Sequence, residues 1–421
     1  MRQTSNHLDG PYKLPEGWRW VRLGEVCAIN PRRPRIQSEP GEPTTFVPMT
    51  AIDEQTGTIV AAEVRPFEEV KRGYTYFEEN DVLFAKITPC MENGKAAIAR
   101  NLLNGFGFGS TEFHVLRPSS FVIAEWIWLF VRREKFREDA KRAFRGGVGQ
   151  QRVPQEFLEQ HPIPLPPLEE QRRIVARIEE LMGRVREARR LREEAKQEAE
   201  RLWQAVLAQT FPRPGSELPE GWRWVRLGEV CSTVESGFAF RKKGAPNGDL
   251  LHLRPYNIAE DGTVDLSQRF YVPSSLRLAR HKMLQPGDVL FNNTNSVELV
   301  GKTALVREPL EAAFSNHITL LRSDTTKAEG GWIALALQAL WRQGFFANLC
   351  NKWIGQAGIN TETLKNVLIP LPPLEEQRRI VAYLQEVQEK IKALKEAQAQ
   401  TEAELKRLEQ AILEKAFRGD L

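Results

Sequence analysis

LPEGWRWVRLGEVC, residues 14–27, recurs letter for letter at residues 218–231. A second stretch, IPLPPLEEQRRIVA, occupies residues 163–176 and recurs at residues 369–382. Looser matches fill the space between these stretches in the same order, and the period is too long for a solenoid repeat. The chain is therefore a tandem duplication in which a globular part and a long helix each occur twice.

The proposed boundaries follow from this duplication. We expect one globular domain at residues 1–165 and a central helix at 166–211. A second globular domain at 212–371 and a C-terminal helix at 372–421 complete the chain. Two copies of one unit should be related by a pseudo-twofold axis, which makes the two long helices antiparallel.

Each helix begins after the tetrapeptide Pro-Leu-Pro-Pro, which favours a stiff polyproline-like strut. Glu169 and Glu170 then complement the helix dipole in the first turn. Apolar or small residues follow at alternating steps of four and three, the pattern of a coiled-coil seam. Polar residues interrupt the seam at Arg192 and Gln398. They either fix the register where the two helices meet or are simply solvated.

The globular parts have the pattern of mixed helix and strand. Residues 82–87 and 113–117, with their counterparts 289–294 and 318–322, are predicted strands. Residues 121–144 and 330–350 are predicted helices, and the glycine-rich residues 105–109 are a predicted loop. The fold class is α+β: two pseudo-twofold-related globular α/β domains separated by two long antiparallel coiled-coil helices.

The composition bounds the function. The net charge is +4, which permits a polyanionic partner without requiring one. No apolar run approaches the ~20 residues of a membrane span, and the amino terminus is no secretory signal. Four cysteines without metal-ligand spacing fit a cytoplasmic protein with free thiols.

Catalytic fingerprints are missing from the sequence. Gly301-Lys302-Thr303 resembles the end of a P-loop, but Ser296 stands where the first glycine is required. A turn between two strands explains this segment better. No zinc-protease, serine-hydrolase or base-flipping methyltransferase motif occurs, so we expect a protein that is not an enzyme and binds no cofactor in this chain.

Polar and basic clusters lie in the parts that differ between the copies. Glycine-rich turns carrying such side chains suit contacts with phosphates and base edges. The candidate DNA-binding residues in the first half are Arg32, Arg33, Arg35, Lys86, Thr88, Arg145, Gln150, Gln151 and Arg152. Those in the second half are Arg241, Lys242, Lys243, Asn293, Asn295, Lys352 and Gln356.

Any one of these clusters is explained as well by a solvated surface loop. The pattern is the stronger argument, because identical frame segments are followed by dissimilar polar loops at matching places. Two readers of different short sequences would have this organisation. The repeated tryptophans Trp18, Trp20, Trp222 and Trp224 are then expected to pack the frame onto the helices rather than to discriminate sequences.

The motifs in this order resemble those of the specificity subunits of type I restriction–modification systems. LPEGWxWxxLGEV opens each half, IPLPPLEEQRRI precedes each helix, NDVLFAKITPCMENGKAAI lies at residues 80–98, and EKAFRGDL ends the chain. The resemblance covers essentially the whole length. It implies that the domains at 1–165 and 212–371 are target recognition domains, and that the helices at 166–211 and 372–421 are spacers.

The resemblance further implies the partners. Double-stranded DNA would be read as a split, asymmetric site, and two methylation subunits would bring S-adenosylmethionine and methylate adenine. Restriction subunits that translocate DNA would complete the nuclease, and no membrane is involved. The alternatives are a recognition subunit of a methylation-only or fused restriction–methylation system and, from another class, a coiled-coil adaptor that joins proteins without binding DNA.

Overall fold

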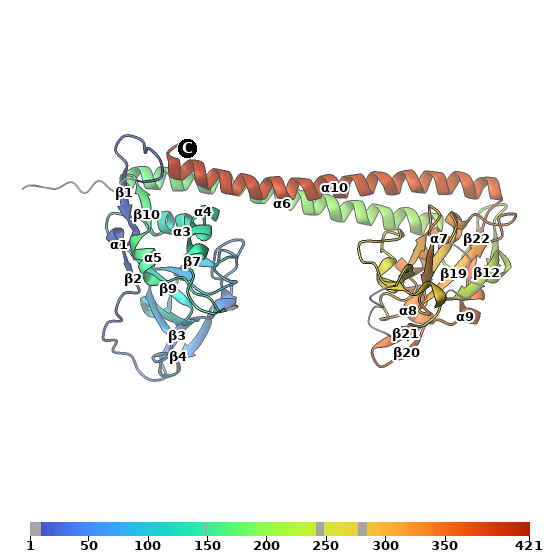
Figure 1. The fold of residues 1–421 in the computed structure, drawn as a ribbon, viewed down its shortest axis with the longest axis horizontal. Helices are drawn as coiled ribbons and strands as arrows, with labels where there is room; N and C mark the ends of the chain where they lie inside the picture. Colours follow the sequence, from blue (N-terminus) through green and yellow to red (C-terminus); the bar gives the residue numbers. More distant parts are fainter. Residues whose placement is uncertain (1–9, 148–149, 241–247, 277–283) are drawn as a thin grey trace, which may run out of the picture. The chain divides into compact units, whose positions relative to one another are not determined.

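The computed structural model describes residues 10–147, 150–240, 248–276 and 284–421. These residues form two compact units. Unit 1 comprises Met1–Leu191 with Ala399–Leu421, and unit 2 comprises Arg192–Gln398. Each unit therefore contains one globular part and a segment of both long helices (Figure 1).

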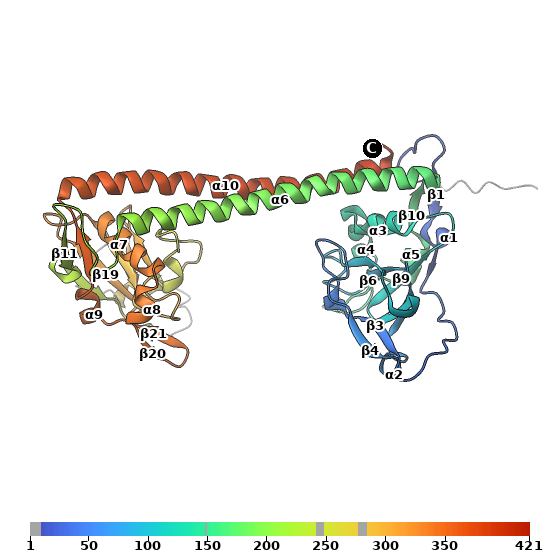
Figure 2. The same ribbon diagram turned by 180° about the vertical axis from the view of Figure 1, so that it is seen from behind.

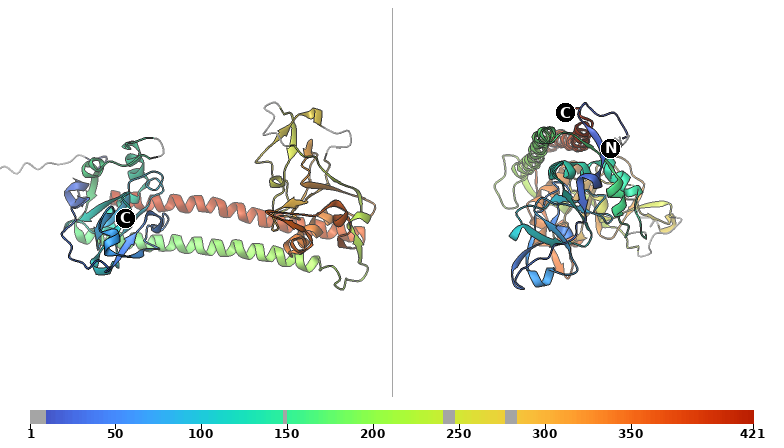
Figure 3. Two further views of the ribbon diagram at one scale, coloured as in Figure 1. Left: turned by 90° about the horizontal axis from the view of Figure 1, so that it is seen from below. Right: turned by 90° about the vertical axis from the view of Figure 1, so that its left-hand side faces the viewer.

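The two predicted long helices are α6, Leu168–Thr210, and α10, Leu374–Arg418. Their segments within unit 1 run antiparallel: Arg173 donates to the carbonyl of Leu421 at 2.9 Å, and Arg189 donates to Glu409 at 2.7 Å. In unit 2, Lys395 pairs with Glu200 at 3.0 Å. The antiparallel pairing is thus confirmed within each unit, and the sheets of unit 1 lie on one side of its helix segments (Figure 3).

Within each unit, the first repeated stretch forms a strand that pairs with a strand of the second repeated stretch. Strand β1, Arg19–Arg22, pairs antiparallel with β10, Pro162–Leu165, so that Trp20 lies opposite Pro164. In unit 2, β11, Arg223–Arg226, pairs in the same register with β22, Leu368–Leu371. The polyproline-like strut expected at Pro-Leu-Pro-Pro is wrong for Pro164 and Leu165, which belong to β10. Each ribbon has only two strands, where proline is tolerated because one side of every strand needs no donor.

Besides the β1-β10 ribbon, the described residues of unit 1 form two four-stranded sheets. One has the order β2-β9-β6-β7 with antiparallel neighbours throughout, and the other has the order β4-β3-β8-β5 with β3 and β8 parallel. The strands of the two sheets are β2 Cys27–Ile29, β3 Pro43–Val47, β4 Glu63–Pro66, β5 Thr75–Glu78, β6 Val82–Ala85, β7 Ala96–Ile98, β8 Phe106–Gly109 and β9 Phe113–Pro118.

Unit 2 repeats the first of these sheets as β12-β19-β15-β17. Its sheet β14-β13-β18 has the same pairings as β4-β3-β8 of unit 1, and a further three-stranded sheet has the order β16-β21-β20. The strands of these sheets are β12 Cys231–Ser236, β13 Leu250–Leu253, β14 Tyr271–Val272, β15 Val289–Asn292, β16 Thr294–Asn295, β17 Thr303–Leu305, β18 Ala312–Phe314, β19 Ile318–Ser323, β20 Asn351–Trp353 and β21 Gln356–Gly358. All four strands expected from the sequence are present as β6, β9, β15 and β19.

Helices cover the repeated sheet in each unit, but both predicted helices are interrupted. Residues 121–144 form α3, Ala124–Arg132, and α4, Glu134–Arg142, because Arg133 is extended between them. Residues 330–350 form α7, Gly330–Arg342, and α8, Phe345–Leu349, separated by Gly344 at a φ of 75°. The remaining α-helices are α1 Leu23–Val26, α2 Phe67–Val70, α5 Gln155–Gln160 and α9 Thr361–Lys365.

The glycine-rich residues 105–109 correct another expectation, because Phe106–Gly109 is strand β8 rather than a loop. A Cβ atom on Gly107 would lie 2.7 Å from the ring of Phe77, and one on Gly109 would lie 2.5 Å from the carbonyl oxygen of Val47. The glycines therefore permit the neighbouring strand and ring to approach. The predicted turn at Gly301 is confirmed, with a φ of 95° directly before β17.

The core of unit 1 joins the repeated ribbon to the helices. Trp126 is fully buried and donates its indole N–H to the carbonyl of Pro164 at 3.0 Å. Its ring lies 5.8 Å from that of Trp18 and 4.3 Å from that of Phe417 in α10. The same contacts recur in unit 2 among Trp332, Pro370, Trp222 and Phe211.

The second tryptophan of each repeat contacts the chain that leads into its ribbon. Trp20 donates to the carbonyl of Tyr12 at 3.1 Å, and the Tyr12 hydroxyl in turn donates to the carbonyl of Phe417 at 2.9 Å. Trp224 donates to the carbonyl of Ser216. Packing onto the helices is thus confirmed for Trp18, which reaches α10 through Trp126, and for Trp222, which donates to Glu376 at the start of α10.

Two further expectations concern the helices and the cysteines. Arg192 and Gln398 are both partly buried, so neither interruption of the seam is fully solvated. All four cysteines are free thiols. Within the described ranges, no helix combines the length and apolar character that a membrane span requires.

Candidate nucleic-acid interface

A polar hairpin stands at the same place in both units. In unit 1 the segments 145–147 and 150–152 are joined by a bridge between Arg145 and Arg152, and Arg152 also bridges Ile87, just beyond β6. In unit 2, β20 and β21 form the hairpin, with Asn351 opposite Gly358, and Gly358 pairs with Thr294, just beyond β15. The two hairpins therefore have the same connections but different sequences.

The structure brings six of the predicted residues of unit 1 into one group. Thr88 donates its backbone N–H to the carbonyl of Gln151 at 3.0 Å, and Lys86 accepts one from Val153 at 2.9 Å. Lys86 and Gln151 are half-buried, while Arg145 and Gln150 are exposed. The polar side chains of this hairpin thus lie beside the end of β6. Two clusters that are distant in the sequence, Lys86 with Thr88 and the hairpin residues, are therefore neighbours in unit 1.

Several of these side chains already have partners within unit 1. Arg152 donates two hydrogen bonds of 2.8 and 2.9 Å to Glu112, and they hold the pKa of Glu112 below its usual value. Thr88 donates its hydroxyl to Glu92 at 2.5 Å, and Arg145 lies 3.5 Å from Glu156. Arg152 and Thr88 therefore stabilise the hairpin, whereas Arg145 presents its charge to solvent.

A buried histidine supports this group, and the sequence did not reveal it. His114 Nδ1 lies 2.9 Å from the side-chain nitrogen of Asn30, and Nε2 lies 2.8 Å from the carbonyl oxygen of Val153. Burial lowers the pKa of His114, so the neutral ring with its proton on Nε2 satisfies both contacts. Asn30, at a φ of 50°, also donates to Gln155. In the sequence, the only sign of this arrangement is Asn30, a single asparagine directly after the strand β2.

The arginines after β2 belong to another part of unit 1. Arg32, Arg33 and Arg35 are exposed in the connection between β2 and β3. Arg33 donates to the carbonyl of Lys71, next to α2, and its guanidinium carbon lies 5.3 Å from the ring centre of Phe108 in β8. Arg33 therefore contacts the β4-β3-β8-β5 sheet rather than the hairpin.

In unit 2 the predicted residues divide into one supporting residue and three on the surface. Asn293 is 5% exposed, and its amide donates to Thr319 at 2.8 Å and to the carbonyl of Asn316 at 3.1 Å. Asn295 is half-buried in β16, while Lys352 and Gln356 are exposed on the hairpin. The predicted residues Arg241, Lys242 and Lys243 lie outside the described residues.

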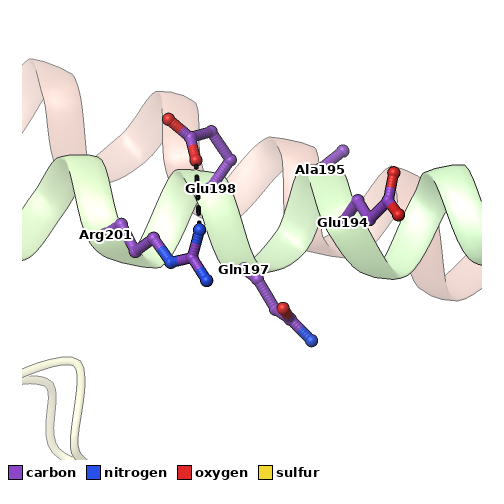
Figure 4. A pocket seen from close by; sticks show the side chains of 5 residues that line it. All are labelled: Glu194, Ala195, Gln197, Glu198 and Arg201. Carbon is purple, nitrogen blue, oxygen red and sulfur yellow. Dashed lines mark ion pairs between the residues drawn. The ribbon is translucent and has the colours of Figure 1, made fainter.

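The described residues contain more than one cavity. One of about 660 Å³ in unit 1 is lined by Tyr12, Arg133 and His161 among others, and Arg133 is paired there with Glu414. Another of about 600 Å³ lies along α6 and is lined by Glu194, Ala195, Gln197, Glu198 and Arg201, with Glu198 3.8 Å from Arg201 (Figure 4). An ion pair that is this exposed to solvent contributes little to the stability of the fold. Among the residues that the structure describes, no three acidic, histidine or cysteine side chains are arranged to hold a metal ion.

Two units with a common frame, different polar hairpins and a share of two long helices define a protein that presents two recognition surfaces on one scaffold. The chain belongs to the family described as the type I restriction modification DNA specificity domain, whose model matches residues 15–197 and 219–404. It is a DNA-recognition specificity subunit of a type I restriction–modification system and is not itself catalytic. Such subunits work in complexes with DNA and other subunits.

Relatives and solved structures agree with this assignment. The specificity subunit of the type I restriction enzyme EcoAI of Escherichia coli is 27% identical over 90% of this chain and 78% of its own length. That of EcoEI, also of Escherichia coli, is 25% identical over 89% and 78%. The HsdS subunit of Thermoanaerobacter tengcongensis is 38% identical, with coverage of 98% and 99% and a TM-score of 0.63.

Another solved chain comes from a study of complex assembly and conformational transition of the type I R-M system. It is 38% identical to this chain, covers 98% of it and 100% of its own length, and has a TM-score of 0.80.

Proposed function

We propose that this subunit reads a split, asymmetric DNA target, with unit 1 reading one half-site and unit 2 reading the other. The observation that carries this proposal is the pair of hairpins, one built on the Arg145–Arg152 bridge and the other spanning Asn351–Gly358, which have equivalent connections and different side chains. A palindromic target would require similar chemistry at both places. Arg145 and Gln150 in one hairpin, against Lys352 and Gln356 in the other, predict two different half-sites.

We infer that the frame binds two copies of a methylation subunit. The positions that repeat in the two halves include one exposed leucine in each long helix: Leu202 of α6 is 55% exposed and Leu408 of α10 is 48% exposed. A single exposed leucine is common on a protein surface, but an exposed leucine at the equivalent position of both helices favours a contact that is made twice. Because the same residue is repeated, the same partner can bind twice.

S-adenosylmethionine and the adenine-methylating groups belong to that partner in this proposal. Restriction subunits that translocate DNA would complete the complex. A methylation-only or fused system remains the alternative arrangement of partners, and it uses the same recognition surfaces.

The test is co-expression of the chain with its cognate methylation subunit, followed by mapping of methylated adenines. A bipartite motif with a fixed gap and two different halves is expected. Replacing residues 28–160 with the corresponding part of another specificity subunit should change one half-site only. A contiguous motif, or no motif with an active partner, would refute the proposal.

DNA binding by the assembled complex separates this function from a coiled-coil adaptor. Affinity for a duplex that carries the motif should fall steeply between 50 and 200 mM salt, because phosphate contacts release counterions. An adaptor would show no DNA affinity at any salt concentration.

A further inference from the structure

The tip of the β20–β21 hairpin carries two exposed apolar side chains. Trp353 is 61% exposed and Ile354 is 106% exposed, and they follow one another directly in the chain. All ten tryptophans lie within the described residues, and Trp353 alone among them is classed as exposed. Figures 1 and 2 show the hairpin at the end of unit 2 that is distant from α10. Such a pair at a protruding tip indicates a contact surface.

The hairpin holds this tip in a defined conformation. Trp353 pairs with Gln356, and Gly355, at a φ of 78°, closes the two-residue turn. The indole lies against Gly358, where an added Cβ atom would be 3.0 Å from the ring. Below the turn, Ala357 is fully buried. The apolar tip is therefore positioned before any partner binds.

Asn293 and Ile359, the residue directly after the hairpin, hold its base. The carbonyl of Asn293 accepts the backbone N–H of Ile359 at 2.8 Å, and its amide donates to Thr319. Both contacts lie inside unit 2, where Asn293 is buried. Asn293 is polar although it is buried, because its amide donates hydrogen bonds to Thr319 and to the carbonyl of Asn316.

The side chains around the tip are those of a groove-binding ribbon. Asn351, Lys352 and Gln356 are all exposed beside Trp353 and Ile354. The major groove of DNA admits a two-stranded ribbon, where amides and ammonium groups reach base edges and phosphates. Apolar side chains there contact the C5-methyl group of thymine.

The variation between the two units favours DNA over a protein as the occupant. A partner that binds twice needs the same residues in both units. The equivalent hairpin of unit 1 instead begins Arg145-Gly146-Gly147 and ends Gln150-Gln151-Arg152. The apolar tip therefore belongs to a part of the chain that changes between the two readers, which is the part that must differ when the half-sites differ.

We propose that the β20–β21 hairpin enters the major groove of the half-site read by unit 2, and that Trp353 and Ile354 contact the C5 edge of a pyrimidine there. This inference rests on the proposed function of unit 2 as the reader of one half-site. Lys352 and Gln356 contribute contacts to phosphates or neighbouring base edges. The tip therefore determines which pyrimidine is accepted at one position.

The experiment measures binding of the complex of this chain with its methylation subunit to a series of duplexes. In each duplex one pyrimidine of the half-site is changed only at C5, thymine to uracil or cytosine to 5-methylcytosine, on either strand. The unchanged complex should show a three- to fivefold change in affinity at one position, about the effect of one buried methyl group. In the double variant W353S/I354S that response should disappear.

Two further variants make the result specific. Phe121→Ser removes a side chain of unit 1 that is also 61% exposed, and it should leave the C5 response intact. Gly358→Ala keeps Trp353 but displaces its ring, and it should weaken the response at the same position. Thermal unfolding of all variants verifies that each is folded.

The outcomes separate the two proposals. An unchanged complex without a bipartite motif overturns the proposed function and this inference together. A complex with a normal bipartite motif, in which W353S/I354S retains the C5 response or no position responds, overturns the hairpin proposal alone. Loss of the methylation subunit from W353S/I354S with an unaltered C5 response would assign the tip to protein contact instead.

Discussion

Arg133 and Glu414 form a two-pronged ion pair within unit 1, with nitrogen–oxygen distances of 3.0 and 2.9 Å. Arg133 is 5% exposed at the junction of α3 and α4, and its guanidinium carbon lies 5.0 Å from the ring centre of Phe417. Ala339 and Ala208 occupy the corresponding positions of unit 2. The pair therefore fastens α10 to the globular part in unit 1 by a contact that the shared frame does not contain.

Arg133→Ala should loosen the end of α10. The change removes two charge-assisted hydrogen bonds and a packed guanidinium, at a cost of about 2 kcal/mol. Amide hydrogen exchange of residues 411–418 should become faster. Arg142→Ala is the matched control, because Arg142 lies 3.4 Å from Asp139 with its side chain 72% exposed. Unchanged exchange in the Arg133 variant would contradict the role of the pair.

A buried glutamine at the start of each long helix supports a second prediction. Gln171 is fully buried, donates to the carbonyls of Phe121 and Pro166, and accepts the N–H of Ile123. Gln377 makes the equivalent three contacts in unit 2.

Replacing either glutamine with leucine leaves three backbone groups without a partner. We expect each variant to lose about 3 kcal/mol of unfolding free energy, measured by chemical denaturation. The losses should be similar in the two units because the contacts are the same. Arg172→Ala, on the exposed face of the same turn, should change stability little. A stable Q171L variant would refute the anchoring role.

The sequence predicted the parts of the fold that depend on local pattern. The seam positions predicted α6 and α10. Short β-like runs after Asn-Asp and Gly-Asp turns predicted β6 and β15, and two other short runs predicted β9 and β19. The interruptions depend on tertiary contacts: Arg133 breaks a helical pattern because its side chain turns toward Glu414. Gly107 and Gly109 belong to a strand because a ring and a neighbouring strand need the space above them. No local rule contains these neighbours.

The candidate interface was predictable to a similar degree. Differences between the copies located both hairpins, because duplication makes unequal segments visible. Contacts decided which of the side chains face solvent: Arg152 is held by Glu112, and Asn293 by Thr319. His114 escaped notice because a single histidine in an apolar strand has the pattern of an ordinary core residue.

Acid should destabilise unit 1 through His161. Burial lowers its pKa from 6.5 to about 4, and the rings of Phe136 and Phe157 lie 4.8 and 4.9 Å away. Between pH 6.5 and 4 the unfolded chain binds a proton that the folded chain does not. Stability is therefore unaffected above pH 6.5 and decreases as the pH falls through this window, by about 2–3 kcal/mol.

His161→Phe keeps an aromatic ring in this position and removes the titration. Its unfolding free energy, measured between pH 7.5 and 4.5, should vary less than that of the unchanged chain. His114, whose pKa is also lowered, accounts for a residual slope in both proteins. Parallel pH profiles would show that His161 does not titrate in this window.

The repeated leucines predict the stoichiometry of the complex. Leu202→Asp and Leu408→Asp each place a charge in one of the two equivalent apolar contacts. Each single variant should retain one methylation subunit, and the double variant should retain none, as measured by native mass spectrometry. Leu191→Asp is the control, because Leu191 is 52% exposed but has Ala397 as its counterpart. Equal loss from all three single variants would show that the effect is not specific to the repeated positions.

Insertion into the long helix should change the gap of the target and not the half-sites. Ala195 lies on the exposed side of α6, away from both hairpins in the sequence. Four added residues extend a helix by about 6 Å, or roughly two base-pair steps. Mapping methylated adenines in the variant should give the original half-sites with a longer gap. A matching insertion after Thr401, the equivalent position of α10, should act in the same direction.

A four-residue insertion in the exposed connection at residues 213–217, outside both helices, is the control and should leave the gap unchanged. If the Ala195 insertion instead alters the bases read in either half-site, the helices take part in recognition and the spacer role is wrong. If it abolishes methylation while the complex still assembles, the gap is fixed by the DNA-bound methylation subunits rather than by helix length. The gap measured in the insertion variants therefore identifies which component sets the distance between the half-sites.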